Sequence, residues 1–140
     1  IFKQSLEMYF KVKNILIWEK NNTGMGDLNG DYAPKYEMIL FATKGRRLLN
    51  GGRDPNIVKF ARTGNKLHPT QKPVELISYL INKSSNKNNI IYDPFMGSGT
   101  LAEASYNNKR NYIGSEIDEA YYEVSLTRED QLGKQGILFV

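Results

Sequence analysis

The chain has 140 residues, of which 40% are hydrophobic and 24% are charged, so it holds about one domain's worth of sequence with a core. It contains no cysteine and a single histidine, His68, which excludes disulfides, cysteine-ligated zinc, iron–sulfur clusters and multi-histidine metal sites. No apolar run approaches the roughly 18 residues of a membrane-spanning helix. A reducing intracellular compartment fits a chain without cysteine.

The hydrophobic pattern predicts strands and helices that alternate along the chain. The predicted helices are 2–12, 73–82, 100–108 and 119–130, and the predicted strands are 14–18, 37–42, 89–93 and 111–116. Glycine and proline mark a long loop at 21–34. Residues 43–67 read as irregular, and the apolar tail 136–140 is left without an assignment. The alternation predicts an α/β fold with a mainly parallel sheet.

The net charge of +4 is unevenly distributed. Between Lys44 and Lys72 there are eight basic residues and one acid, Asp54, so this segment carries +7, whereas the rest of the chain carries −3. A basic segment on a slightly acidic body indicates a surface for a polyanion such as nucleic acid. The alternative is a solvated loop whose charges only favour solubility.

A second feature is the loop within residues 90–101, IIYDPFMGSGTL. A short apolar strand runs into Asp93, a turn with Gly97 and Gly99 follows, and a helix begins near Thr100. In an open α/β sheet, ligands bind beyond the carboxyl ends of the strands. Glycine lets the backbone approach a ligand closely, and the new helix offers unpaired N–H groups. The sequence therefore predicts a ligand site in this loop.

The neighbouring residues restrict the ligand. The Lys-Ser/Thr pair of a phosphate-binding loop does not follow Gly99, which disfavours a nucleoside triphosphate. The spacing Gly97-x-Gly99-x-x-Ala102, with Glu116 ending the next strand, fits NAD or any other adenosine-containing cofactor. Asp93 would repel a pyrophosphate and pair with an ammonium group, so S-adenosylmethionine is favoured, with Glu116 on its ribose. The alternative is that Asp93 only caps the turn and Glu116 only ends a strand.

Three segments occur in order between Leu67 and Asp118: HPTQKPVELISYLI, IIYDPFMGSGTLAEA and NYIGSEID. Together they closely resemble the permuted β-type DNA amino-methyltransferases. Upstream, LIWEKNN and YEMILFATKG are similar to the two strands at the far edge of that family's sheet. The resemblance implies a Rossmann-like, S-adenosylmethionine-dependent methyltransferase fold that is incomplete in this chain. Residues 1–43 would be truncated edge strands and a helix of the catalytic half, 44–67 a short basic target-recognition insert, and 68–140 the cofactor-binding half.

The resemblance also implies a role for each matching residue. The residues expected to bind S-adenosyl-L-methionine are Thr70, Gln71, Lys72, Asp93, Pro94, Phe95, Gly97, Ser98, Gly99, Thr100, Glu116 and Ile117. The residues expected to contact double-stranded DNA are Lys44, Arg46, Arg47, Arg53, Arg62 and Lys66. Neither a metal nor a membrane is implied. The expected setting is the cytoplasm, with a bacterial or phage gene, and a restriction endonuclease partner or a homodimer stays open.

The implied reaction transfers a methyl group to the exocyclic amino group of a flipped base, with adenine favoured over cytosine. The family's catalytic motif, Asp, Asn or Ser followed by Pro-Pro and an aromatic residue, is absent. Neither Asp54-Pro55 nor Asp93-Pro94 continues in this way. We therefore expect no catalytic residue in this chain, the motif upstream of Ile1, and no activity from the chain alone.

The sequence is compatible with two alternatives. The missing motif and the basic segment together favour a non-catalytic, nucleic-acid-binding remnant of the same fold. An RNA or protein methyltransferase that shares the Asp-Pro-Phe loop is the other.

Overall fold

The computed structural model describes residues 2–24, 27–64, 67–133 and 137–139. The chain divides into two compact units, residues 1–62 and 63–140, and each is described by itself. In the part of the chain that the structure describes, no helix has the length and hydrophobicity needed to cross a membrane.

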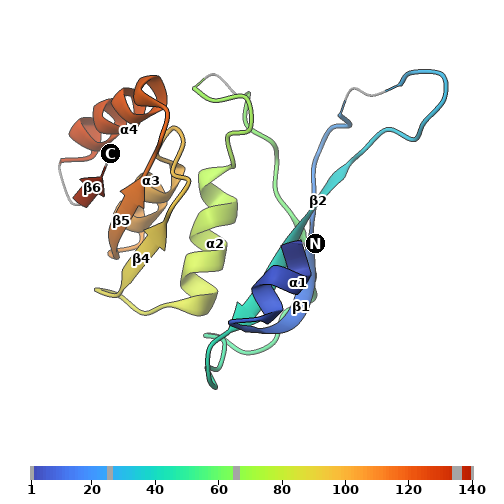
Figure 1. Ribbon diagram of the computed structural model, residues 1–140, viewed down its shortest axis with the longest axis horizontal. Helices are drawn as coiled ribbons and strands as arrows, with labels where there is room; N and C mark the ends of the chain where they lie inside the picture. Colours follow the sequence, from blue (N-terminus) through green and yellow to red (C-terminus); the bar gives the residue numbers. More distant parts are fainter. Residues whose placement is uncertain (1, 25–26, 65–66, 134–136, 140) are drawn as a thin grey trace. The chain divides into compact units, whose positions relative to one another are not determined.

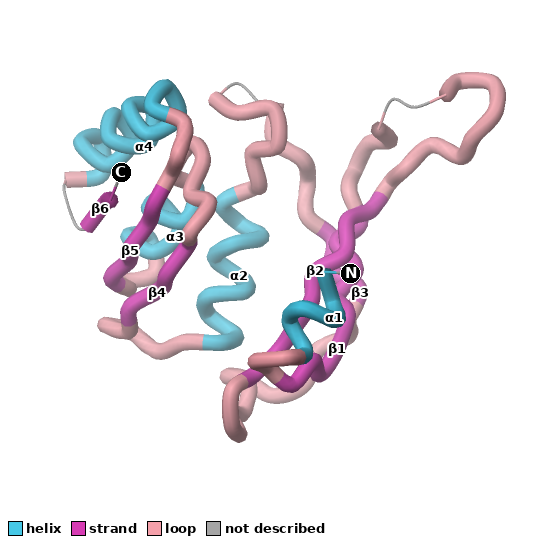
Figure 2. Tube along the Cα trace, in the orientation of Figure 1, coloured by secondary structure: helices cyan, strands magenta, loops and turns pink. Residues whose placement is uncertain are grey.

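The first unit is a three-stranded sheet with one short helix. Its elements are α1 (Phe2–Glu7), β1 (Lys11–Glu19), β2 (Tyr36–Thr43) and β3 (Ile57–Lys59), and the strand order is β2-β1-β3. β1 pairs with β2 in the antiparallel sense and with β3 in the parallel sense. The connection from β1 to β2 (Figure 2) is closed at its base by a 2.8 Å hydrogen bond from the N–H of Lys20 to the carbonyl of Lys35.

Trp18 is the centre of this small sheet. Its side chain is 1% exposed, it lies opposite Val58 of β3, and its Nε1 donates to the carbonyl of Phe60 at 2.9 Å. The predicted helix over residues 2–12 is too long, because Lys11–Glu19 pair with β2 and leave only Phe2–Glu7 helical. β3 lies inside the segment 43–67 that the sequence indicated to be irregular.

The second unit alternates helices and strands. Its elements are α2 (Val74–Ser84), β4 (Ile90–Asp93), α3 (Thr100–Asn107), β5 (Asn111–Ser115), α4 (Glu119–Leu132) and β6 (Ile137–Phe139). The strands form one sheet in the order β4-β5-β6, and both pairs are parallel. α3 packs against α2, α4 and β5 (Figure 1). The predicted α/β fold with parallel strands is confirmed, although the strands belong to two sheets and the β1–β2 pair is antiparallel.

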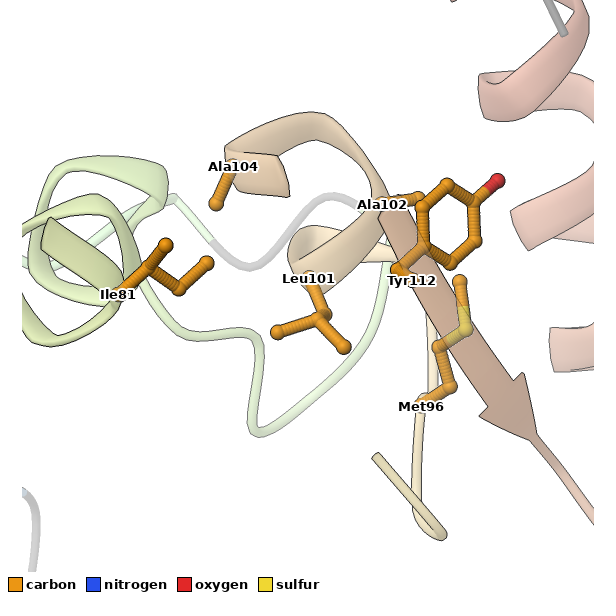
Figure 3. Close-up of a cluster of buried hydrophobic side chains, with 6 residues drawn as sticks. All are labelled: Ile81, Met96, Leu101, Ala102, Ala104 and Tyr112. Carbon is orange, nitrogen blue, oxygen red and sulfur yellow. The ribbon is translucent and has the colours of Figure 1, made fainter. Parts of the chain in front are cut away.

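The core of the second unit lies where α3 meets β5. Figure 3 shows its buried members: Ile81, Met96, Leu101, Ala102, Ala104 and Tyr112. The two alanines are fully buried, and their small side chains let α3 approach its neighbours closely. Met96 belongs to the glycine loop itself, so the loop is anchored in the core by its own apolar side chain. The position of the loop is therefore fixed by packing as well as by hydrogen bonds.

Buried Arg110 joins the far ends of two helices in this unit. Its Nη2 and Nε donate to the carbonyl and hydroxyl of Ser85 at 2.8 and 3.2 Å, and its Nη1 donates to the carbonyl of Asn108 at 2.5 Å. Ser85 and Asn108 are the C-terminal caps of α2 and α3. A cation at this position complements the negative ends of both helix dipoles.

Candidate functional site

The second unit contains a cavity of about 150 Å³ at the carboxyl end of β4. Eight of the residues expected to bind the cofactor line it: Thr70, Gln71, Lys72, Asp93, Phe95, Gly97, Ser98 and Thr100. Four residues that the sequence reasoning did not assign also line it: His68, Ile77, Met96 and Leu101. The segment before α2 and the loop before α3 therefore form the walls of one cavity, although 20 residues lie between Lys72 and Asp93 in the sequence.

Asp93 ends β4 and is half-buried in this wall. Its Oδ1 accepts a 3.0 Å hydrogen bond from the N–H of Phe95. Burial raises the pKa of Asp93, the Phe95 hydrogen bond opposes this, and the nearby Glu116 carboxylate adds to the rise. A partly desolvated carboxylate beside a second one is an unfavourable place for an anion, and it favours a cation. The electrostatics of the cavity therefore suit an ammonium-bearing ligand.

Glu116 follows β5 and is bound to the glycine loop. Its Oε2 accepts from the N–H of Gly97 at 2.7 Å, and its Oε1 accepts from the N–H groups of Ile117 and Asp118 at 2.9 and 3.0 Å. A carboxylate oxygen has two lone-pair sites, so Oε1 is fully used by the Ile117 and Asp118 N–H groups, whereas Oε2, which accepts one N–H, keeps a site for a further donor. The Glu116 carboxylate thus links the glycine loop to the start of α4 by hydrogen bonds, and it is also a candidate acceptor for a ligand hydroxyl.

The glycine loop needs its glycines for two different reasons. Gly97 has a φ of +54° and Gly99 a φ of +77°, a region that residues with a Cβ rarely adopt. At Gly97, a Cβ would make ordinary contact with the His68 ring, 3.6 Å away. At Gly99, a Cβ would lie only 3.1 Å from the Cβ of Ser125 on α4. Gly99 therefore allows close packing of the loop on a helix, and Gly97 allows the turn.

The segment before α2 has its own internal bonds. The Nδ1 atom of His68 accepts from the N–H of Thr70 at 3.1 Å, and the His68 ring stacks at a tilt on Tyr121, with 4.1 Å between the ring centroids. The Thr100 hydroxyl donates to the Lys72 carbonyl at 3.3 Å. These contacts hold the backbone around Thr70 to Lys72 against the glycine loop.

Four residues that were expected to bind the cofactor do not line the cavity: Pro94, Gly99, Glu116 and Ile117. Gly99 and Glu116 instead support the loop, as described above. The Pro94 carbonyl accepts from the Ser115 hydroxyl at 3.2 Å. The side chain of Ile117 is 98% exposed, so it is free to cover a ligand lying across the end of β5.

The residues expected to contact DNA belong to the first unit, except Lys66, which lies outside the described residues. Lys44, Arg46, Arg47, Arg53 and Arg62 are all exposed. Arg53 lines an open cavity of about 460 Å³ together with Asn14 and Asn56. Arginine and asparagine are side chains that contact phosphates and base edges in DNA complexes.

Arg128 of α4 is a site-supporting residue that the sequence reasoning missed. It donates to the carbonyl of Ser98 in the glycine loop at 3.0 Å and to Glu103 of α3 at 2.7 Å. The available signal was the spacing of Tyr121, Ser125 and Arg128, which puts them on one face of a helix. Over the described ranges, no group of three or more potential metal ligands occurs.

The comparisons with known proteins define the class of this chain. Residues 50–127 match the family model N6_N4_Mtase, described as DNA methylase. This match spans more than half of the 140 residues, so the chain belongs to the DNA methylase family, and the resemblance inferred from its motifs is confirmed.

The similar proteins include type II methyltransferases. The chain is 33% identical to the type II methyltransferase M2.MboI of Moraxella bovis, over 90% of this chain and 52% of that protein. It is 32% identical to M.HpaI of Haemophilus parainfluenzae, over 93% of this chain and 48% of that protein. The chain thus spans about half the length of the curated relatives it matches.

Solved structures also resemble the chain. The complex of M1.HpyAVI with SAM superimposes with a TM-score of 0.78 at 32% identity, and covers 89% of this chain and 66% of that one. PvuII DNA methyltransferase, which is cytosine-N4-specific, superimposes with a TM-score of 0.76 at 16% identity, over 94% of this chain and 59% of that one. The second likeness shows the fold alone, which is the fold of DNA methyltransferases.

Proposed function

We propose that this chain carries the cofactor-binding site and part of the DNA-facing surface of a DNA amino-methyltransferase that uses S-adenosyl-L-methionine. The observation that carries the proposal is the partly desolvated Asp93 carboxylate in the cavity wall, beside a glycine loop bound by Glu116. The structure of the related M1.HpyAVI was determined with SAM, which supports the same cofactor here.

The residues present fit this cofactor's chemistry. Its α-ammonium group needs a carboxylate partner, and Asp93 is such a group with a raised pKa and a second carboxylate nearby. Its ribose carries two hydroxyl groups that need acceptors, and Oε2 of Glu116, which accepts one N–H from Gly97, retains a site for one of them. Exposed Phe95 and Ile117 offer apolar surface for the adenine. When bound, the cofactor supplies a methyl group on a positively charged sulfur.

The chain's own residues mainly bind and orient. Asp93 would pair with the ammonium group, and the backbone from Gly97 to Thr100 would shape one wall. Thr70, Gln71 and Lys72 line the facing wall of the cavity. Holding the reacting groups in line converts a bimolecular reaction into an effectively unimolecular one. These roles are assigned to binding and orientation, and no proton transfer is assigned to a residue of this chain.

The basic residues of the first unit would contact the DNA substrate. Exposed arginines such as Arg46 and Arg53 would bind phosphates or base edges of the duplex. We propose the exocyclic amino group of a flipped base as the methyl acceptor, adenine N6 ahead of cytosine N4. Methylation by a longer polypeptide that joins this chain to a Pro-Pro-aromatic motif, assayed on oligonucleotides that contain only one of these two amino groups, distinguishes the two targets. A bacterial cytoplasmic setting, a restriction endonuclease partner and a homodimer belong to the same proposal.

The Pro-Pro-aromatic motif is absent from these 140 residues, which favours a chain that binds its ligands without catalysing methyl transfer. We propose that the 140 residues bind cofactor and DNA but do not transfer the methyl group by themselves. A non-catalytic, nucleic-acid-binding member of the fold is the second candidate, and the same absent motif together with the +7 segment favours it. Cofactor binding distinguishes the two, because a remnant that only binds nucleic acid has no need of an intact ammonium site.

Calorimetric titration of the 140-residue chain tests the proposal. S-adenosyl-L-methionine and S-adenosylhomocysteine should bind, because both carry the ammonium group and the ribose, whereas NAD and ATP should not. Incubation with DNA and methyl-labelled cofactor should leave the DNA unlabelled. If circular dichroism shows that the chain is folded and it does not bind the cofactor, the cofactor assignment is refuted. Labelled DNA would refute the proposal that the chain alone is inactive.

A further inference from the structure

The glycine loop is held residue by residue, each by a different neighbour. The N–H of Met96 donates to the Ser115 carbonyl at 3.0 Å, Gly97 is bound to Glu116, and the Thr100 hydroxyl reaches the Lys72 carbonyl. Between them, Ser98 is buried and its carbonyl is bound by Arg128. The shape of this cavity wall therefore depends in part on Ser115, Glu116 and Arg128, which do not line the cavity.

Arg128 makes the most extensive of these connections. Its Nε and Nη2 both contact Oε2 of Glu103, at 2.7 and 2.6 Å, and its Nη1 donates to the Ser98 carbonyl at 3.0 Å. The arginine side chain is 11% exposed and that of Glu103 is 30% exposed. One guanidinium thus joins α4 to the first turn of α3 and to the loop that precedes it.

The rest of this face of α4 contacts the same site. Tyr121, in the first turn of the helix, packs against the ring of His68, which lines the cavity. Ser125, four residues further on, is fully buried and lies where a Cβ at Gly99 would collide with it. Arg128 continues the face. Three successive contacts along one helix therefore support the two walls of the cavity.

We propose that Arg128, held by Glu103, is a positioning residue for the cofactor: it fixes the Ser98 carbonyl and with it the glycine loop that forms the cavity wall. The inference rests on the proposed cofactor. Replacing Arg128 or Glu103 should therefore weaken cofactor binding by more than any general loss of folding stability would explain. Arginine is required because its planar fork donates to two acceptors at once, whereas lysine offers a single charged centre.

Arg110 provides a matched control in the same unit. It is also a buried arginine that donates to main-chain carbonyls. It lies, however, at the C-terminal ends of α2 and α3, away from the residues that line the cavity. The variants to compare are R128M, R128K, E103Q and R110M. Each is first checked for folding by circular dichroism, and its dissociation constant for S-adenosyl-L-methionine is then measured by calorimetry well below its melting temperature.

The R128M variant should bind the cofactor roughly 2- to 30-fold more weakly than the unchanged chain, the range of effects for residues that act through others. E103Q should show a smaller loss, and R128K should recover part of the affinity. R110M should lower the melting temperature while leaving the dissociation constant unchanged. Hydrogen exchange should accelerate in a peptide covering residues 94–101 in R128M and not in R110M.

The outcomes separate the two levels of inference. If the unchanged chain does not bind the cofactor, the proposed function fails. If it binds and R128M binds equally well, the positioning role of Arg128 is refuted while the cofactor assignment stands. Equal losses of affinity in R128M and R110M would also refute it, because they would trace the effect to general destabilisation. Should R128M fail to fold, the comparison of R128K and E103Q with R110M decides in the same way.

Discussion

Replacing Asp93 by Asn should make the empty protein more stable and the cofactor complex weaker. Asn keeps the shape of the side chain and can still accept the hydrogen bond from the Phe95 N–H that Oδ1 now accepts at 3.0 Å. It removes the negative charge, which burial and the Glu116 carboxylate both disfavour. The same charge is the partner proposed for the ammonium group of the cofactor.

The effect on binding follows from the loss of one charge-assisted hydrogen bond. Such bonds contribute about 1.5–3 kcal/mol, which corresponds to a dissociation constant roughly 10- to 150-fold higher. Calorimetric titration with S-adenosyl-L-methionine at pH 7 measures this directly. An unchanged dissociation constant in D93N would refute the ammonium assignment.

The effect on stability has a defined pH dependence. Because the pKa of Asp93 is raised in the folded state, the folded chain binds this proton more tightly than the unfolded chain does. The stabilisation is complete below the ordinary pKa of Asp and is lost as the pH rises through the raised pKa. D93N lacks this loss, so the amount by which its free energy of unfolding, measured by urea denaturation, exceeds that of the unchanged chain should grow from pH 3.5 to pH 7. The reasoning is wrong if the difference between the two proteins stays constant over that range.

Three further predictions concern other parts of the molecule. Gly99→Ala should destabilise the chain by about 1–3 kcal/mol, because the left-handed backbone and the contact with Ser125 both oppose a Cβ. Urea denaturation measures this, and equal stability would contradict the packing described for Gly99. R110M should lower the free energy of unfolding by about 1–3 kcal/mol in the same measurement, because the carbonyls at the helix ends lose their donors. An unchanged free energy of unfolding would mean that water replaces the guanidinium as donor. Charge reversal at both Arg46 and Arg47 should weaken DNA binding and flatten its salt dependence in a fluorescence anisotropy titration without changing cofactor affinity; unchanged DNA affinity would remove these residues from the interface.

The parts of the fold that could be predicted are those with local signals. The strand before Asp93, the glycine turn and the helix from Thr100 are specified by adjacent residues, so their bounds in the sequence and the structure nearly coincide. β3 gave no such signal, because it has three residues and a single buried side chain, Val58. It exists because β1 offers an edge to pair with.

The supporting contacts of the site could not be predicted for a related reason. Glu116 is 19 residues from Gly97, and Arg128 is 25 residues from Glu103. The sequence shows that these residues have charges, and only the folded chain shows which backbone and side-chain groups they reach. Glu116 was expected to face a ribose, and in the structure its carboxylate already bonds to three backbone N–H groups.

β4 pairs on one side only within the described ranges, with β5, and its Ile90 and Tyr92 side chains are exposed. A parallel sheet is normally covered on both faces, and an exposed edge strand is a template for pairing with another chain. We therefore expect an uncovered β4 to favour association between copies of this chain at high concentration. Aggregation during purification would then start at that strand, which lies next to the cavity. Aggregated samples would therefore lose ligand binding as they lose monodispersity.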